Sequence, residues 1–347
     1  MNNITSFNST RYNYPSFQGL NSSIQKNRHF SFEYLFRIIG NRFADKFESR
    51  ENKIITQHIA QIIPEQKKSF LNKMNDIASF FSTHNPVEVN YEDKILEQIA
   101  QKKESTIFIL THSNQKKDPQ MLALLNKMLA DAYEAVGNTE AFQLPKIILN
   151  KDILTTMNPI KRKAFENFGA VGIDANISSK DSSFNAKAFF PVIKDFLQDK
   201  CNIFIFPEGR LAIYKSLPLE KRFQSGIAEL INKLLNSKKQ INVVPVGFGY
   251  GKVDSIQIGY PVVFKRNGDV TTVTKGSIPK SENPLSKFFE KFSKQTDIPI
   301  TENGKPVEQN NLTAFIKGIL CENLKVCASI ASKKSEKEIT GQSILEI

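Results

Sequence analysis

The sequence predicts an α/β protein with a mixed, largely parallel sheet flanked by helices, behind a small N-terminal helical region. From residue 106 onward, short apolar runs of strand length alternate with longer segments of helical periodicity. That alternation is typical of strands joined by crossover helices. The chain has 347 residues, of which 40% are hydrophobic and 24% are charged, so it can bury a sizeable core. This composition excludes collagen-like and fully disordered proteins. The apolar runs are too short for a polytopic membrane protein.

Composition divides the chain into four segments. Residues 1–31 contain no Asp or Glu and are rich in Asn and Ser, which predicts a disordered N-terminus. Residues 32–101 show helical spacing and are expected to form a helical front domain. The α/β domain is expected over 102–268, and a C-terminal helical extension with a frayed tail over 269–347. An acid-free start also matches organelle transit peptides, so targeting through residues 1–31 is the alternative to a cytoplasmic protein.

The expected elements of the α/β domain follow from its apolar runs. Strands are predicted over 106–111, 146–150, 170–173, 203–206, 242–247 and 256–264. Helices are predicted over 119–135, 159–167, 185–199 and 223–236, with two more in the extension over 285–294 and 312–331.

The charge balance predicts an anionic partner. Lys and Arg number 47 against 35 Asp and Glu, a net charge of +12. Nucleic acid, acidic lipid headgroups and phosphorylated substrates all fit such a surface. The nucleic-acid reading rests on charge alone, because no helix-turn-helix or ribonucleoprotein motif is present. The three cysteines form no Cys-x-x-Cys pair, which argues against a zinc knuckle and favours a reducing compartment.

Two segments have the pattern of basic amphipathic helices. Over 285–294, a leucine and three phenylalanines share one helical face and lysines surround it. Residues 32–43 have a similar pattern. Such a helix suits the surface of an anionic membrane, and the alternative is that its apolar face packs onto the domain. Peripheral attachment to the inner face of the membrane is therefore one expectation.

His112 and Asp118 form the first candidate site. His112 directly follows the strand predicted over 106–111, and ligands in α/β sheets gather at the carboxyl ends of strands. A histidine held by an aspartate can act as a general base towards a hydroxyl. Asp118 precedes Pro119 and an apolar helix, so it also fits the N-cap of that helix. Both roles can hold together, because an N-cap aspartate has a fixed position.

The second candidate site is the turn that ends the apolar strand over 203–206. The sequence Phe-Pro-Glu-Gly-Arg occupies 206–210. Pro207 ends the ladder and Gly209 permits a tight turn, which presents Glu208 and Arg210 at the strand end. Arg210 could pair with a phosphate. The alternative is a surface turn with a local ion pair.

Taken in order, these segments resemble motifs of the glycerolipid acyltransferase superfamily. This superfamily includes the lysophosphatidic acid acyltransferases and glycerol-3-phosphate acyltransferases. Its His-x4-Asp block is similar to residues 112–118, and its Gly-x-x-x-Ile-Asp-Arg block to 169–175. Its Phe-Pro-Glu-Gly-Thr-Arg block is similar to 206–210, and its Val-Pro-Val block to 244–246. The resemblance spans roughly residues 105 to 265.

The resemblance implies a fold, a reaction and a set of site residues. A fatty acyl group would move from an acyl thioester, acyl-CoA or acyl-ACP, to a hydroxyl of glycerol-3-phosphate or 1-acyl-glycerol-3-phosphate in phospholipid biosynthesis. His112 would accept the hydroxyl proton and Asp118 would orient the imidazole. Glu208, Gly209 and Arg210 would bind the phosphorylated acceptor. The resemblance implies no cofactor beyond the thioester co-substrate and no metal.

The sequence departs from these motifs in three places. Five residues, not four, separate His112 from Asp118. Ala175 stands where the second block has its arginine, and the third block lacks its threonine. These departures leave an alternative open, namely a degenerate acyltransferase-fold protein that binds lipid surfaces. A basic nucleic-acid-binding protein is the more remote alternative, and no nucleic-acid partner is expected.

Overall fold

The computed structural model describes the α/β part of the chain. The described residues are 57, 87–90, 94–112, 117–173, 186–208, 219–274, 298–302, 305–307 and 309–336. The predicted disordered N-terminus and the amphipathic segments 32–43 and 285–294 lie outside them. So does the rest of the expected front domain before residue 87, apart from residue 57.

The main sheet contains ten strands. They are β1 (Val87–Asn90), β2 (Thr106–Leu110), β3 (Lys146–Asn150), β4 (Ala170–Ile173), β5 (Ile203–Ile205), β6 (Gln240–Gly249), β7 (Asp254–Ile258), β8 (Val262–Asn267), β9 (Val270–Thr274) and β10 (Ile298–Pro299). A separate two-stranded sheet pairs β11 (Thr301–Glu302) with β12 (Lys305–Pro306).

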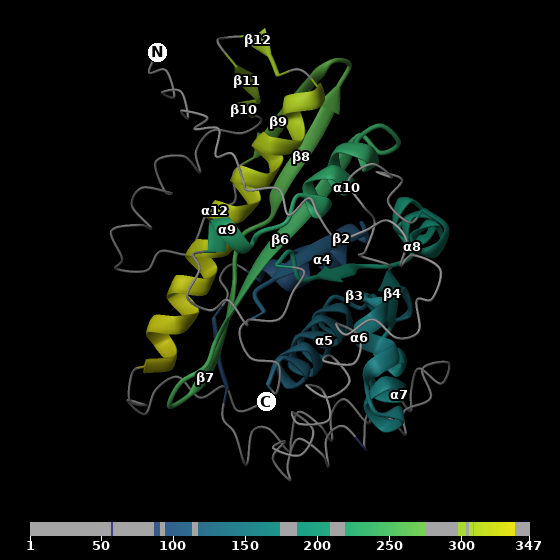
Figure 1. The fold of residues 1–347 in the computed structure, drawn as a ribbon, viewed down its shortest axis with the longest axis vertical. Coiled ribbons are helices and arrows are strands. Elements are labelled where there is room, and N and C mark those ends of the chain that lie inside the picture. The colour runs from purple at the N-terminus through teal and green to yellow at the C-terminus, as the bar shows by residue number, and fades with distance from the viewer. Residues whose placement is uncertain are drawn as a thin grey trace, which may run out of the picture.

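The described helices flank this sheet (Figure 1). They are α4 (Ile95–Lys102), α5 (Asp118–Ala135), α6 (Lys151–Thr156), α7 (Pro159–Asn167), α8 (Ala186–Leu197), α9 (Leu219–Arg222), α10 (Gly226–Leu234) and α12 (Gln309–Glu336), with a short 3-10 turn, η1 (Thr139–Ala141).

The sheet is mixed, with a parallel centre. Its order is β10-β9-β8-β6-β2-β5-β3-β4, and the pairs from β6 through to β4 are all parallel. On the other side of β6, the strands β7, β8 and β9 pair in antiparallel fashion. Strand β1 adds to β7 in parallel. The predicted fold class is thus confirmed.

Side chains of the central strands alternate between two apolar layers. In β2, Phe108 and Leu110 face a cluster that includes α4 and α5. Ile107 and Ile109 face the opposite cluster, which includes α8, α10 and α12. Burial on both faces explains why the sequence of β2 is an uninterrupted apolar run rather than an alternating one.

Helix α12 lies directly against the backbone of β6. A Cβ atom added at Gly247 would lie 2.3 Å from the carbonyl carbon of Cys327, and one at Gly249 would lie 2.3 Å from the carbonyl oxygen of Ala331. Only glycine permits such an approach. The Ser255 hydroxyl also donates to the Ala331 carbonyl at 2.6 Å. The C-terminal helix is therefore part of the α/β core.

Most predicted elements are present, but several bounds differ and some elements were not predicted, among them the short helix α6. The strand expected over 256–264 is two strands, β7 and β8, because the Gly-Tyr-Pro segment at 259–261 breaks the ladder. The helix expected over 223–236 is the shorter α10 (Gly226–Leu234), and a separate short helix, α9 (Leu219–Arg222), precedes it. Strand β9 was not predicted, although the Asn-Gly pair at 267–268 is a hairpin signal. Strand β1 and all but the last residue of α4, which were expected in the front domain over 32–101, pack with the α/β domain.

Candidate active site

The candidate site lies where three neighbouring strands end or pass. His112 follows the carboxyl end of β2, and Glu208 follows that of β5, its parallel neighbour. Strand β6 is the neighbour of β2 on the side opposite β5, and it extends beyond the last residue of β2. Its Phe248 N–H donates to the Thr111 hydroxyl at 2.8 Å, and the Thr111 N–H donates to the Val246 carbonyl at 3.1 Å. These bonds fix the backbone immediately before His112.

His112 and Asp118 are in direct contact, as the sequence predicts. The Nδ1 atom of His112 is hydrogen-bonded to Oδ2 of Asp118. The aspartate side chain is 4% exposed, whereas that of the histidine is 18% exposed. The ring of His112 also packs against Phe206, with 4.9 Å between ring centroids. With Nδ1 bound to a carboxylate, Nε2 is the nitrogen left to exchange a proton with a substrate.

Asp118 is the first residue of α5, not its N-cap. Lys117 occupies the N-cap position and makes no capping hydrogen bond through its side chain. This corrects the N-cap expectation by one residue. The carboxylate is instead turned towards the sheet, where it meets His112. The positive end of the helix dipole favours a negatively charged side chain in the first turn, which is where Asp118 lies.

Tyr250 is a site residue that the sequence analysis did not identify. It follows the last residue of β6, and its hydroxyl donates to the second carboxylate oxygen of Asp118, Oδ1. Burial raises the pKa of Tyr250 well above its ordinary value, and the negative charge of Asp118 raises it further. The tyrosine therefore stays protonated and acts as a donor. Because 132 residues separate it from Asp118 in the chain, no local spacing indicates the contact.

Glu208 connects three elements of the site. Its Oε1 accepts from the backbone N–H of His112 at 2.9 Å, and its Oε2 accepts from Arg222 of α9. The Glu208 side chain is 2% exposed and that of Arg222 is 21% exposed. Partial burial lowers the pKa of Arg222, although an arginine stays charged in proteins. In this structure both oxygens of Glu208 have protein partners, whereas the sequence motif predicts that the residue binds substrate.

A second ion pair anchors the start of α5. The ammonium group of Lys117 lies 2.8 Å from both carboxylate oxygens of Asp254, the first residue of β7. Asp254 is 5% exposed, so the lysine neutralises a buried charge. Lys117 and Asp118 thus both bind the hairpin formed by β6 and β7, one through Asp254 and the other through Tyr250.

The remaining predicted site residues lie outside the described part of the chain. Gly209 and Arg210 belong to the undescribed range 209–218, and Ala175 to the undescribed range 174–185. Of the predicted site, the structure therefore brings together His112, Asp118 and Glu208. It adds Tyr250 and Arg222 to them.

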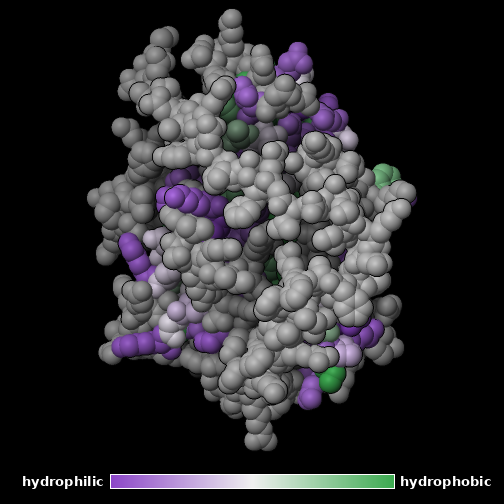
Figure 2. Space-filling view, viewed as in Figure 1, coloured by the Kyte–Doolittle hydropathy of each residue, from purple (hydrophilic) through white to green (hydrophobic). Residues whose placement is uncertain are grey.

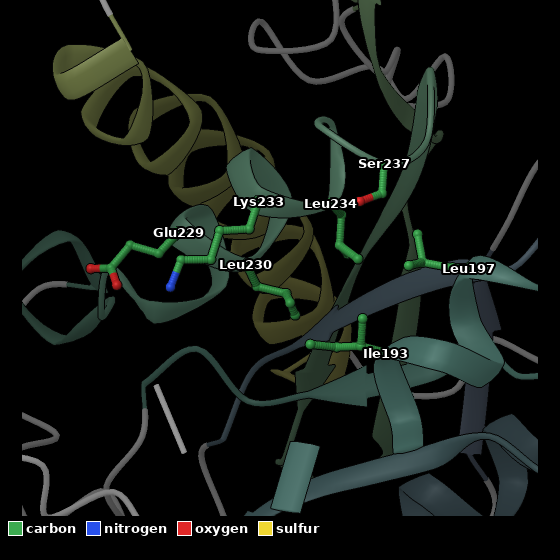
Figure 3. A pocket seen from close by; sticks show the side chains of 7 residues that line it. All are labelled: Ile193, Leu197, Glu229, Leu230, Lys233, Leu234 and Ser237. Carbon is green, nitrogen blue, oxygen red and sulfur yellow. The ribbon is translucent and has the colours of Figure 1, made fainter. Parts of the chain in front are cut away.

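A small apolar cavity lies elsewhere, between α8 and α10 (Figure 3). Its volume is about 190 Å³, and its apolar wall consists of Ile193, Leu197, Leu230 and Leu234. Charged and polar side chains complete the lining, namely Glu229, Lys233 and Ser237. None of the candidate site residues contributes to it.

The described residues show neither a metal site nor a membrane-spanning helix. They contain no group of three or more His, Cys, Asp or Glu side chains placed to hold a metal ion. Among the described helices, none is long and apolar enough to cross a bilayer. In the view of Figure 2, the described surface is mainly hydrophilic, with small hydrophobic spots.

Comparison with known proteins finds one kind of similarity. No protein-family model matches the sequence, and no curated protein is significantly similar to it. Among solved structures, the chain is similar to the 1-acyl-sn-glycerophosphate (LPA) acyltransferase PlsC from Thermotoga maritima. The match has 13% sequence identity and a TM-score of 0.36, over 75% of this chain and 93% of that one. Similarity at this level does not establish a shared activity, so the function is inferred from the side chains of the site.

Proposed function

We propose that the chain is an acyltransferase that moves a fatty acyl group from an acyl thioester to a glycerol phosphate hydroxyl. The donor is acyl-CoA or acyl-ACP, and the acceptor is glycerol-3-phosphate or 1-acyl-glycerol-3-phosphate. The observation that carries the proposal is the buried carboxylate of Asp118, which binds Nδ1 of a partly exposed histidine at the carboxyl end of a central strand. That arrangement suits a general base for a hydroxyl nucleophile.

The proposed reaction proceeds through His112. Its Nε2 accepts the proton of the acceptor hydroxyl while the oxygen attacks the thioester carbonyl carbon. Asp118 stabilises the imidazolium that forms. The C–S bond then breaks, the thiolate takes the proton from His112, and an ester and a free thiol leave. The backbone N–H of His112 already donates to Glu208, so it is not the donor that we assign to the developing oxyanion.

We propose different roles for the two charged residues of the turn after β5. Glu208 holds the backbone of His112 in place, because its Oε1 accepts from that N–H and its Oε2 from Arg222. Arg210, two positions further on, remains our candidate for the phosphate of the acceptor, together with Gly209. A guanidinium pairs with phosphate through two parallel hydrogen bonds, which would orient the acceptor hydroxyl towards Nε2.

A thioester-release assay with an acceptor panel tests the proposal. The purified chain is mixed with palmitoyl-CoA or palmitoyl-ACP, and free thiol is measured with glycerol-3-phosphate, 1-acyl-glycerol-3-phosphate, or glycerol as a phosphate-free control. We expect thiol release that depends on a phosphorylated acceptor. His112→Ala should abolish this release, and matching circular dichroism spectra would show that the variant keeps its fold although it loses the contacts with Phe206 and Asp118.

The same assay separates the alternatives. A chain that binds anionic vesicles but releases no thiol with any acceptor would be a degenerate acyltransferase-fold protein, the alternative that Ala175 keeps open. Thiol release that is equal with and without acceptor would indicate a thioesterase and would contradict acyl transfer.

A further inference from the structure

We propose that Tyr250 is a positioning residue of this site, whose hydroxyl holds the Asp118 carboxylate in the orientation that His112 requires. The inference rests on the proposed function in one respect only: the reaction that the pair serves. The positioning itself depends on contacts that the structure describes.

The two oxygens of the Asp118 carboxylate have different protein partners. Oδ2 meets Nδ1 of His112, and Oδ1 accepts from the hydroxyl of Tyr250. A carboxylate held at one oxygen can still rotate about its Cβ–Cγ bond. A second donor on the other oxygen removes that rotation, and the 4% exposure of Asp118 leaves little water to replace the donor. Tyr250 therefore determines where the carboxylate plane lies relative to the imidazole.

The charges around Tyr250 keep its hydroxyl on Asp118. Two carboxylates act on it, Asp118 at the start of α5 and Asp254 at the start of β7. Lys117 binds both oxygens of Asp254 at 2.8 Å, which neutralises that carboxylate. Asp118 is then the anionic acceptor that the tyrosine binds. With its pKa raised well above the ordinary value by burial and by these charges, the hydroxyl remains a donor throughout the physiological pH range.

Connectivity explains why the pair needs an external support. Five residues separate His112 from Asp118, so the chain alone permits many orientations of the two side chains. The hairpin of β6 and β7 removes this freedom, because it binds two consecutive residues at the start of α5. Tyr250 holds Asp118 and Asp254 holds Lys117. The hairpin itself is fixed by its ladder and by α12, against which Gly249 packs.

The test compares Tyr250→Phe with Tyr133→Phe. Tyr133 is a buried tyrosine in α5, and its hydroxyl is hydrogen-bonded to Asn202 rather than to the site. Both variants lose one hydrogen-bonded hydroxyl, so both should be less stable than the parent, Tyr250→Phe more so because its partner is a carboxylate. We expect kcat to fall about tenfold to a hundredfold in Tyr250→Phe only, a large part of what a general base contributes. The KM for the acceptor should change less than twofold.

The pH profile gives a readout that a loss of stability would not change. Without the tyrosine donor, the negative charge of Asp118 acts more fully on the imidazole and favours its protonated form. The acidic limb of the kcat/KM profile should therefore move to higher pH in Tyr250→Phe and stay in place in Tyr133→Phe. Replacing Tyr250 by 3-fluorotyrosine keeps its shape and strengthens its hydroxyl as a donor, so it should move the limb to lower pH.

A proton NMR measurement decides the inference independently of activity. The Nδ1 proton of His112 should give a downfield resonance in the parent, and the same resonance should be shifted or broadened in Tyr250→Phe. If kcat, the pH profile and this resonance all equal the parent's in both Tyr250 variants, the inference is wrong. A parent without transferase activity would contradict the proposed function, and the resonance would then decide the positioning alone.

Discussion

Glu208→Gln distinguishes a supporting role of this residue from direct substrate binding. The glutamine keeps the volume and can still accept from the His112 N–H with its amide oxygen. Its amide nitrogen, however, would face the Arg222 guanidinium, so two donors would meet where an ion pair exists in the parent. Breaking a buried ion pair by removing one partner typically costs about 3–5 kcal/mol. Because Arg222 is 21% exposed and can turn to water, we expect about 2 kcal/mol.

Urea unfolding and steady-state kinetics measure this effect. A loss of about 2 kcal/mol corresponds to a fall in Tm of about 4–8 °C in a domain of 150–250 residues. Arg222→Met is the matched variant. This variant leaves the Glu208 carboxylate, which is 2% exposed, without its ion-pair partner. Its loss of unfolding free energy should therefore be larger, about 3 kcal/mol. The double variant should cost less than the sum of the two single variants, because it removes both charges.

The kinetics then identify the role. If Glu208 holds the backbone of His112, Glu208→Gln should lower kcat and leave the KM for the acceptor nearly unchanged. A variant as stable as the parent, with a raised acceptor KM, would refute the supporting role. That result would instead support a direct contact between Glu208 and the substrate, as the sequence motif implies.

Two further predictions concern the framework of the site. Lys117→Met should lower stability by about 1–3 kcal/mol in urea unfolding, because it leaves the buried carboxylate of Asp254 unpaired; an unchanged midpoint would mean that this ion pair contributes nothing. Gly247→Ala should prevent α12 from packing on β6 and give little soluble protein or a greatly lowered Tm, since the added Cβ would lie 2.3 Å from backbone. Gly226→Ala is its control, with nothing within 4 Å of the added Cβ, and should be neutral or stabilising by up to about 1 kcal/mol.

The central strands could be predicted because each is a short apolar run that is buried on both faces. Strand β2 is the clearest case, since every one of its residues is buried. Strand β1 could not be predicted because its four residues are only partly buried and precede the alternating strands and helices that begin at residue 106. Strand β9 is not indicated because its sequence, Val-Thr-Thr-Val-Thr, follows a polar turn and lies at the start of the polar segment expected as the C-terminal extension.

The site could be predicted only where its residues follow one strand closely. His112 and Asp118 flank a single loop after β2, so the strand-end rule and their spacing indicated both. Tyr250 required the register of β6 against β2, which no local pattern provides. The two-residue alternation of β6 indicates only that Val246, Phe248 and Tyr250 lie towards the same layer as α5, and not that Tyr250 contacts Asp118. That layer is confirmed for Val246 and Phe248 by their packing in the cluster that contains α5.

The central claim is that His112 acts as the base in acyl transfer to a phosphorylated hydroxyl. The most direct test follows a 13C-labelled acyl thioester by mass spectrometry, with glycerol-3-phosphate or 1-acyl-glycerol-3-phosphate as acceptor, in the parent and in His112→Gln. Matching melting curves would show that both are folded. We predict a labelled ester from the parent in amounts equal to the thiol released, and at least a hundredfold less from His112→Gln. Ester formation at the same rate in both proteins, or thiol release by the parent without any labelled ester, would contradict the claim.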